Sequence, residues 1–439
     1  MDTADLLAIT ADDLTVSRLG ERTVDTPLRD LLGGREESVH YVTETDRVLL
    51  DDTLGVAKRR GAAGDLPAFN PGGPRGKLYF EPTAVTAAIV TCGGLCPGLN
   101  NVVRALVLQL ANAYGVKTVL GFRNGYRGLT DGSTPLTLTP EFVRDIHNRG
   151  GTILGTSRGG QDPAAMVETL ARYQVDMLFV IGGDGTLRGA QKLAVEAAGR
   201  ALPLAVVGIP KTIDNDIPWI DQSFGFQTAF ARAAESIRAA HTEAASTAGG
   251  VGLVKLMGRH SGFIACYATL ANHDVDFTLI PEVPFRLDSF LTCVRKRVEQ
   301  QGHAVVVVAE GAGQELFPQS AETDASGNAR LGDIGTLLRE SLTGHFVDHG
   351  TALSLRYVDP GYAIRSVPAN AFDAVYCTRL AQAAAHAGMA GFTSMVVARW
   401  HGRFIHLPIA LATATRNQVD PHGDLWMSVL EANGQPKHL

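Results

Sequence analysis

Three features are scarce in this sequence: clustered positive charge, cysteine and long apolar runs. The 439 residues carry 39 Lys and Arg against 45 Asp and Glu, which gives a net charge of -6 without any basic block. Proteins that bind nucleic acids or anionic membranes usually carry clustered Lys and Arg, so we expect neither partner. No apolar run reaches the length that crosses a bilayer, so we expect no membrane span.

Cysteine usage and the N-terminus bear on the cellular compartment. The five cysteines are scattered along the chain: Cys92, Cys96, Cys266, Cys293 and Cys377. Their odd number suits a reducing cytoplasm, and residues 1–5 lack the features of a signal peptide, so we expect a cytoplasmic protein. Cys92 and Cys96 lie four residues apart without a second Cys/His pair at zinc-like spacing. Packed thiols are therefore favoured over a metal site.

The sequence is rich in apolar, β-favouring runs that alternate with Ala-rich segments of helical period. Near-continuous apolar strands separated by helices are typical of parallel sheets covered on both faces, so we predict a doubly wound α/β fold. The runs cover 84–91, 175–183, 202–210, 250–258, 303–311 and 391–400, with helical segments such as 224–245 and 371–388 between them. Residues 1 to about 80 are turn-rich and predict an extension that wraps a core. The polar segment 317–332 predicts a mobile surface loop.

Polar residues follow the predicted strands, where ligands bind in open parallel sheets. In "TCGGLCPGLNNVVR" (91–104), glycines precede a helix, which suits either an anion or an ordinary tight turn. In "GGDGTLRG" (182–189), Asp184 and Thr186 lie among glycines, which suits Mg²⁺ with phosphate oxygens or, alternatively, an Asx-turn. Arg158 in "LGTSRGGQD" (154–162) is a candidate cation for a phosphoryl group.

The stretch "PKTIDND" (210–216) ends another predicted strand with two carboxylates. Asp214 could accept a hydroxyl proton while Asp216 orients it or reaches a metal; the alternative is a turn with solvated acids. Arg259 in "VKLMGRHSGF" (254–263) suits a phosphate or a sugar hydroxyl, and Glu310 in "VVAEGAG" (307–313) suits sugar hydroxyls. Together these loops predict phosphoryl chemistry on a polar metabolite.

The motifs GGLCPGLN, GTSRGG, GGDGT, PKTIDND, MGRHSGFIA and EG occur in this order, and with them the chain resembles the phosphofructokinase family over roughly residues 85–415. "GPRGKLYF" and "YVDPGYAIRSVPAN" are similar to the long-chain, plant-type branch of ATP-dependent members, which is related to the pyrophosphate-dependent enzymes. The resemblance implies two Rossmann-like α/β domains with the active site in the cleft between them. It implies a donor domain (84–225 and 359–410), a fructose-6-phosphate domain (226–358), an N-terminal extension (1–83) and a C-terminal segment (411–439).

The resemblance also implies a reaction, in which the γ-phosphoryl group of ATP passes to the 1-hydroxyl of fructose 6-phosphate with Mg²⁺ held at Asp184. It implies a homo-oligomer, either a tetramer or a dimer. The implied catalytic residues are Asp214 as general base, Asp216, Arg158 and Gly94. The implied donor-binding residues are Gly94, Tyr126, Arg158, Gly159, Gly183, Asp184, Gly185, Thr186 and Lys211. The implied sugar-phosphate contacts are Thr212, Asp214, Asp216, Met257, Gly258, Arg259 and Glu310.

The sequence departs from the family pattern at two places. Short-chain members carry a histidine and an arginine for the 6-phosphate where this chain reads "YVDPGYAIRS", so we assign that role to Tyr357 and Arg365. Gly250 stands where short-chain members place an arginine that reaches across from a neighbouring subunit.

Two positions in the sequence bear on the identity of the phosphoryl donor, and they favour different donors. Pyrophosphate users in the family typically carry Asp where Gly185 stands and Lys where Lys211 stands. A carboxylate at 185 would crowd and repel the α-phosphate of a nucleotide, so Gly185 favours ATP. Pyrophosphate is the alternative donor. A kinase of another small molecule such as NAD, which shares GGDGT, and a non-catalytic sugar-phosphate sensor are more remote alternatives.

Overall fold

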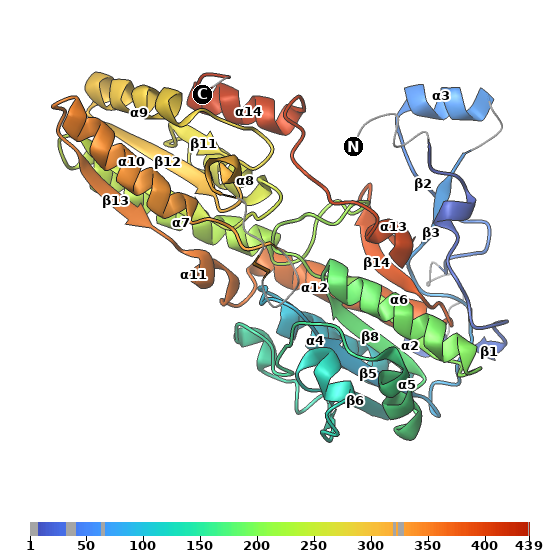
Figure 1. The fold of residues 1–439 in the computed structure, drawn as a ribbon. Helices are drawn as coiled ribbons and strands as arrows, with labels where there is room; N and C mark the ends of the chain where they lie inside the picture. The colour runs from blue at the N-terminus through green and yellow to red at the C-terminus, as the bar shows by residue number, and fades with distance from the viewer. Residues whose placement is uncertain (1–7, 32–40, 63–65, 319–321, 324–328, 438) are drawn as a thin grey trace. The chain divides into compact units, whose positions relative to one another are not determined.

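The computed structural model describes residues 8–31, 41–62, 66–318, 322–323, 329–437 and 439 (Figure 1). The chain divides into two units of segments that pack together. Unit 1 comprises Met1–Thr212, Ile217–Gly225 and Val367–Thr415, and unit 2 comprises Ile213–Asp216, Phe226–Ser366 and Arg416–Leu439. Residues 213–216 are therefore counted with unit 2, although their neighbours on both sides belong to unit 1.

Unit 1 is built on a mixed sheet with a parallel centre. Its strand order is β2 (Val48–Leu49), β3 (Ala68–Pro71), β15 (Arg403–Pro408), β14 (Met395–Trp400), β9 (Ala205–Pro210), β8 (Met177–Gly182), β5 (Thr86–Thr91), β6 (Thr118–Phe122), β7 (Leu136–Thr137). The strands from β14 to β6 are parallel, and β15, β3, β2 and β7 join antiparallel at the two edges. Strands β8 and β9 are buried along their whole length, as expected for strands covered on both faces.

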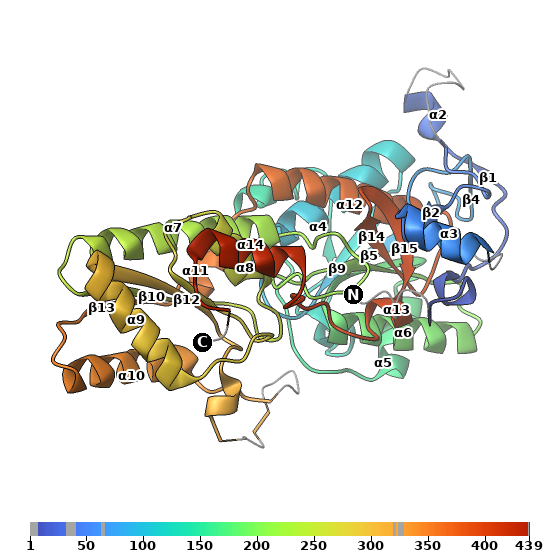
Figure 2. The same ribbon diagram turned by 90° about the horizontal axis from the view of Figure 1, so that it is seen from above.

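Helices cover both faces of this sheet (Figure 2). One face packs against α4 (Leu99–Leu108), which continues into η3 (Gln109–Tyr114), and α12 (Ala371–Met389). The other packs against α6 (Asp184–Gly199), beside which lie α5 (Pro163–Arg172) and α13 (Ile409–Ala412). Short 3-10 turns η4 (Gly125–Leu129) and η5 (Ile146–Asn148) complete the connections. Helices α4 and α6 follow β5 and β8, so the loops of interest lie at the carboxyl ends of parallel strands.

The N-terminal extension packs on the sheet of unit 1. Strand β3 pairs with β15, and β2 pairs with β3, so the extension adds two short strands to one edge. It also contributes η1 (Asp12–Leu14), α2 (Leu28–Leu31), α3 (Leu54–Ala62) and the small ribbon of β1 (Val24–Asp25) with β4 (Lys77–Leu78). An added strand satisfies backbone groups that an exposed edge would leave unpaired.

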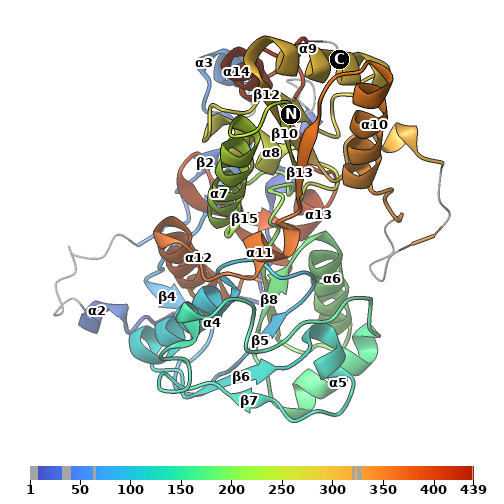
Figure 3. The same cartoon turned by 90° about the vertical axis from the view of Figure 1, so that its left-hand side faces the viewer.

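Unit 2 has a parallel sheet in the order β11 (Phe277–Leu279), β12 (His303–Ala309), β10 (Gly250–Leu256), β13 (Ser354–Val358). Helices α7 (Phe226–Ala245) and α8 (Phe263–Leu270) pack on one face, with α14 (Asp424–Asn433) against α8. Helices α9 (Leu287–Gln301) and α10 (Ile334–Asp348) pack on the other (Figure 3). The remaining elements are η6 (Gln314–Leu316) and α11 (Gly361–Arg365).

The predicted fold class is confirmed, because every predicted strand and both predicted helices form at their expected places. The predicted loop 317–332 lies partly outside the described residues, as does part of the predicted extension 1–83. Among the helices of the described residues, none combines the length and apolar character that crossing a bilayer requires.

Candidate active site

In unit 1, a buried lysine joins two strand-end loops. Lys211, which directly follows β9, is 6% exposed, and its Nζ donates a hydrogen bond to the Gly94 carbonyl after β5 at 2.8 Å. Arg158 lies beside the same glycine, since a Cβ placed on Gly94 would sit 3.9 Å from Arg158 Nη2. The Gly93 N–H donates to the Ser157 carbonyl at 3.1 Å. The structure therefore brings Gly94, Arg158 and Lys211 together.

Asp184 opens helix α6, directly after β8. Gly183 is the residue before the helix, and a Cβ there would lie 3.2 Å from the Lys211 carbonyl oxygen. The Asp184 carboxylate accepts a hydrogen bond from Arg188 Nη2 at 3.0 Å, one turn along the same helix. A Cβ on Gly185 would meet no heavy atom within 4 Å. The space beside Gly185 is therefore open, and a larger side chain fits there without disturbing the fold.

Tyr126 contacts the first turn of α6 through a hydrogen bond. It lies in η4 after β6, and its hydroxyl donates to the Thr186 carbonyl at 2.6 Å. Burial raises the pKa of the Tyr126 phenol well above its usual value. A Cβ on Gly189 would lie 2.7 Å from the Tyr126 ring, so the glycine leaves room for it. The predicted donor residue Tyr126 thus uses its hydroxyl to hold the backbone of α6.

Gly159 and Thr212, two further predicted contacts, also lie in unit 1. Gly159 has φ of +90°, a conformation that a side chain would strain, and nothing lies within 4 Å of its Cβ position. Thr212 was predicted to contact the sugar phosphate, but it belongs to the unit that carries the donor loops, where its carbonyl accepts a hydrogen bond from the Ser223 hydroxyl. Among the predicted sugar-phosphate contacts, Thr212 is the one that unit 2 does not contain.

In unit 2, Asp214 is a partly buried carboxylate in a negative environment. Among the described residues, its Oδ1 is buried and has no hydrogen-bond partner. Burial, together with the negative charges of Asp216 and Glu310, raises the pKa of Asp214 to about 8. The backbone N–H of Arg259 and the charge of Arg416 act in the opposite direction. Asp214 is therefore a stronger base than an ordinary aspartate.

Asp216 is tied to the C-terminal segment. Its Oδ2 lies 3.0 Å from Arg416 Nη1, and its backbone carbonyl accepts a hydrogen bond from the Asn417 N–H at 2.8 Å. The Ser261 hydroxyl donates to the Asp214 carbonyl at 3.2 Å, which fixes the loop from its other side. The sequence analysis missed Arg416, because 200 residues separate it from Asp216 and no local motif marks it.

Arg259 and Glu310 lie on two strand-end loops whose backbones touch. The Gly311 N–H donates to the Gly258 carbonyl at 3.0 Å. A Cβ on Gly311 would lie 2.0 Å from the Arg259 carbonyl oxygen, so this approach requires glycine. Burial raises the pKa of Glu310, and the positive charge of Arg259 partly offsets this rise. Arg259 Nη2 also donates to the Ala329 carbonyl.

Lys255 is a second residue that the sequence analysis missed. Its Nζ lies 2.9 Å from Asp359 Oδ2 and 3.3 Å from Asp333 Oδ1. Burial lowers the pKa of Lys255, but the hydrogen bond and charge of Asp359 outweigh it and raise the value overall. The positive charge of Lys255 also lowers the pKa of Glu310. A lysine within the apolar run of β10 was a usable sequence signal, because burying a charge requires a partner.

The predicted 6-phosphate residues, Tyr357 and Arg365, lie near this cluster. Tyr357 pairs in register with Leu253 on β10, and its hydroxyl packs on α10, where a Cβ on Gly335 would be 2.2 Å away. The Arg365 guanidinium lies 4.7 Å from the centre of the Tyr362 ring, and its charge lowers the pKa of Glu310. The predicted contact Met257 lies between Leu256 and Gly258, at the end of β10.

The cysteine pair packs beside the loop after β5. Burial raises the pKa of Cys92 to about 12, and the Cys96 thiol donates to the Phe224 carbonyl at 3.2 Å. Within the described ranges, no three His, Cys, Asp or Glu side chains form a group that could hold a metal.

Known proteins similar to this chain point to one family. The sequence model of the Phosphofructokinase family matches residues 86–388. An ATP-dependent 6-phosphofructokinase of Amycolatopsis methanolica is 58% identical, covering 97% of this chain and 95% of that protein. ATP-dependent 6-phosphofructokinase 7 of Arabidopsis thaliana is 50% identical, covering 84% of this chain and 78% of that protein.

Two solved structures share the fold. The T-state phosphofructokinase of Pichia pastoris superposes with a TM-score of 0.63 at 25% identity, covering 80% of this chain and 37% of that longer chain. The pyrophosphate-dependent phosphofructokinase of Marinobacter aquaeolei superposes with a TM-score of 0.66 at 21% identity, covering 79% of this chain and 91% of that chain.

Proposed function

The chain belongs to the phosphofructokinase family, and we infer that it is an ATP-dependent 6-phosphofructokinase. It transfers the γ-phosphoryl group of ATP to the 1-hydroxyl of fructose 6-phosphate, giving fructose 1,6-bisphosphate and ADP. The observation that carries this conclusion is the 58% identity, over nearly the whole chain, to an ATP-dependent 6-phosphofructokinase. The open space beside Gly185 supports the choice of ATP, because a nucleotide needs room for its α-phosphate there.

Asp214 is the general base in this proposal. A base works best when its pKa lies near the working pH, and burial together with the neighbouring carboxylates raises the pKa of Asp214 to about 8. Its buried Oδ1, which has no partner in the described part of the chain, is available to the 1-hydroxyl proton. Asp216, held by Arg416 at 3.0 Å, keeps the loop in place and orients the sugar hydroxyl.

The donor phosphates bind to the strand-end loops of unit 1. The N-terminus of α6 presents backbone N–H groups to a phosphate. Arg158 and Lys211 place positive charge near the transferring phosphoryl group. Gly94 has no side chain, so its backbone can come close to that group. Because Lys211 already donates to the Gly94 carbonyl, its main effect is to fix the shape of this loop.

Asp184 fits a magnesium ion that is shared with the substrate. Mg²⁺ usually takes one or two carboxylates, with phosphate oxygens and water as its other ligands, so a cage of three protein ligands is not needed. The carboxylate at the start of α6 lies where the phosphates would bind and keeps 20% of its side chain exposed. Mg²⁺ held by Asp184 would neutralise charge on the donor phosphates.

The sugar phosphate binds to unit 2 in this proposal. Arg259 and Glu310, which lie on touching loops, contact the sugar phosphate and its hydroxyl groups. Tyr357 and Arg365 serve the 6-phosphate, and Met257 and Gly258 shape the loop around the ring. Thr212 contributes from unit 1.

We further propose that the protein is a cytoplasmic homo-oligomer, either a tetramer or a dimer. Light scattering would measure the mass of the assembly.

A coupled assay tests this function directly. ADP release should require both fructose 6-phosphate and Mg²⁺, with ATP as the better donor. Turnover with pyrophosphate and none with ATP would overturn the donor assignment. Phosphorylation of NAD without phosphorylation of the sugar phosphate would overturn the acceptor assignment.

A further inference from the structure

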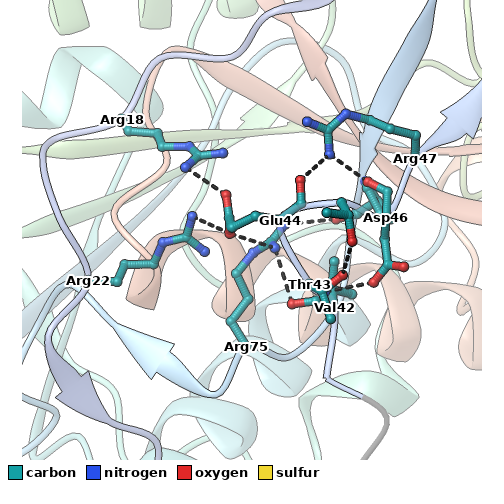
Figure 4. Close-up of polar contacts among 10 residues, drawn as sticks. Arg18, Arg22, Val42, Thr43, Glu44, Asp46, Arg47 and Arg75 are labelled. Carbon is teal, nitrogen blue, oxygen red and sulfur yellow. Dashed lines mark hydrogen bonds and ion pairs between the residues drawn. The ribbon is translucent and has the colours of Figure 1, made fainter.

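A cavity of about 390 Å³ lies where the N-terminal extension folds back on unit 1. Its charged lining residues are Arg18, Glu21, Arg22, Glu44, Arg75 and Lys77. Figure 4 shows Arg18, Arg22, Glu44 and Arg75, which come from separate stretches of the extension. Arg75 belongs to the "GPRGKLYF" stretch, to which the proposed reaction gives no role. The volume is within the range of small-molecule sites, and the wall is unusually rich in cations.

Three guanidinium groups in this cavity share one carboxylate. Arg18 Nη1 lies 2.9 Å from Glu44 Oε2, Arg22 Nη2 lies 2.7 Å from Glu44 Oε1, and Arg75 Nη1 lies 3.6 Å from the same Oε1. The neighbouring Arg47 donates hydrogen bonds to the backbone carbonyls of residues 44 and 46. Among the described residues that line the cavity, there are four cations, Arg18, Arg22, Arg75 and Lys77, and two carboxylates, Glu21 and Glu44, so positive charge is in excess.

Arg75 is the most deeply placed of the three cations. Its side chain is 4% exposed, and its Nε has no hydrogen-bond partner among the described residues. Burial, together with the charge of Arg22, lowers the pKa of Arg75 to about 10. Burial likewise lowers the pKa of Arg22. A buried cation with an unmet donor is costly unless an anion pairs with it.

The buried aromatic ring beside the three arginines carries no negative charge. The three guanidinium carbons lie 5.1, 5.3 and 5.0 Å from the centre of the Phe392 ring. Behind that ring lies His406, which is fully buried. Burial and the three arginines lower the pKa of His406 far below its usual value, so it stays neutral. The ring offers each cation a weak attraction but does not neutralise three of them.

We propose that this cavity binds a small anion bearing a phosphate group, which the three arginines grip beside Glu44. Arginine pairs with phosphate through parallel hydrogen bonds, and a phosphate group brings negative charge that the two lining carboxylates, Glu21 and Glu44, do not fully provide. The competing explanation is that the arginines serve only to clamp Glu44 and so fasten the extension. Both explanations predict that neutralising Glu44 lowers stability, but only the proposed site predicts that phosphate restores it.

The test is thermal unfolding and calorimetric titration of the full-length protein with inorganic phosphate, with chloride at matched ionic strength as reference. Arg18→Gln and Arg22→Gln should each weaken phosphate binding about tenfold, as expected for loss of a charge-assisted hydrogen bond. Glu44→Gln should bind phosphate more tightly, and phosphate should restore the stability that this variant loses. Arg200→Gln is the matched control, because Arg200 pairs with Glu196 at 2.7 Å on the surface of unit 1.

Phosphate can also bind at the active site, and a comparison of variants distinguishes that binding from binding in the cavity. Arg18 lies outside the strand-end loops, so the difference between the wild type and Arg18→Gln reports on the cavity alone, and turnover without added phosphate should be unchanged. Glycerol 3-phosphate, tested in parallel, shows whether the site accepts a phosphate ester or the free ion. Equal phosphate effects in the wild type, Arg18→Gln and Arg22→Gln would overturn the proposal. So would a Glu44→Gln protein whose lost stability phosphate does not restore.

Discussion

The two units carry different charged side chains near the proposed site. In unit 1, the strand-end loops carry glycines, Arg158 and Lys211, and Asp184 opens α6. Unit 2 carries Asp214, Asp216 and Glu310, and burial raises the pKa of Asp214 and of Glu310. In the proposed function, the groups of unit 1 serve the donor phosphates and the carboxylates of unit 2 serve the sugar hydroxyl group.

The two proposed roles place different demands on the side chains. A phosphate donor is large and negative, so its site needs open backbone and cations that it can reach. A base must be desolvated to become strong, which requires burial among other acids. The three predictions below act on one side of this comparison at a time.

Replacing the base should have the largest effect. Asp214→Asn keeps the shape of the side chain but cannot accept a proton, so kcat should fall about a hundredfold to ten-thousandfold. The measurement is steady-state turnover with ATP and fructose 6-phosphate, together with a thermal melt. An unchanged kcat would contradict the assignment of Asp214.

The thermal melt provides the control for this variant. The expected direction of the change in stability follows from the pKa of Asp214. The folded protein keeps a proton on Asp214 up to pH about 8, whereas the unfolded chain releases it near its ordinary value of 3.8. Stability from this group is therefore complete below pH about 4 and is lost as pH rises toward 8. Asp214→Asn removes that loss, so at pH 7 it should unfold at the same temperature as the wild type or higher.

Filling the open space in unit 1 should have the next largest effect. Gly185→Asp places a negative charge where we propose that the donor's α-phosphate binds, and like charges in contact cost several kcal/mol, so kcat/KM for ATP should fall about a hundredfold. Nothing lies within 4 Å of the Cβ position of Gly185, so the variant should fold normally. Gly185→Ala is the matched control, because it adds volume without charge.

The donor assay separates the outcomes for this variant. Pyrophosphate has no α-phosphate bearing a nucleoside, so its use should be less affected than that of ATP. Equal losses with both donors, or no loss with ATP, would contradict the steric and electrostatic argument at position 185.

The sequence predicted the parts of the molecule that depend on local pattern. Buried runs such as those of β8 and β9 indicated parallel strands, and their ends located Asp184 and Asp214. It could not predict that β2 and β3 join the sheet of unit 1, because strands of two and four residues carry no clear period. Nor could it find the pairing of Arg416 with Asp216, which depends on the folded chain alone.

The smallest effect should come from that distant partner in unit 2. The positive charge of Arg416 lowers the pKa of Asp214, partly by neutralising Asp216 at 3.0 Å. Arg416→Gln removes this charge, so the pKa of Asp214 should rise above its value of about 8. The base is active only when deprotonated, so the acid limb of kcat/KM against pH should move to higher pH by a fraction of a unit. Arg416→Lys, which keeps the charge, should leave the limb in place. A limb that moves to lower pH, or a loss of rate that is equal at every pH, would show that Arg416 acts on the loop in some way other than through the pKa of Asp214.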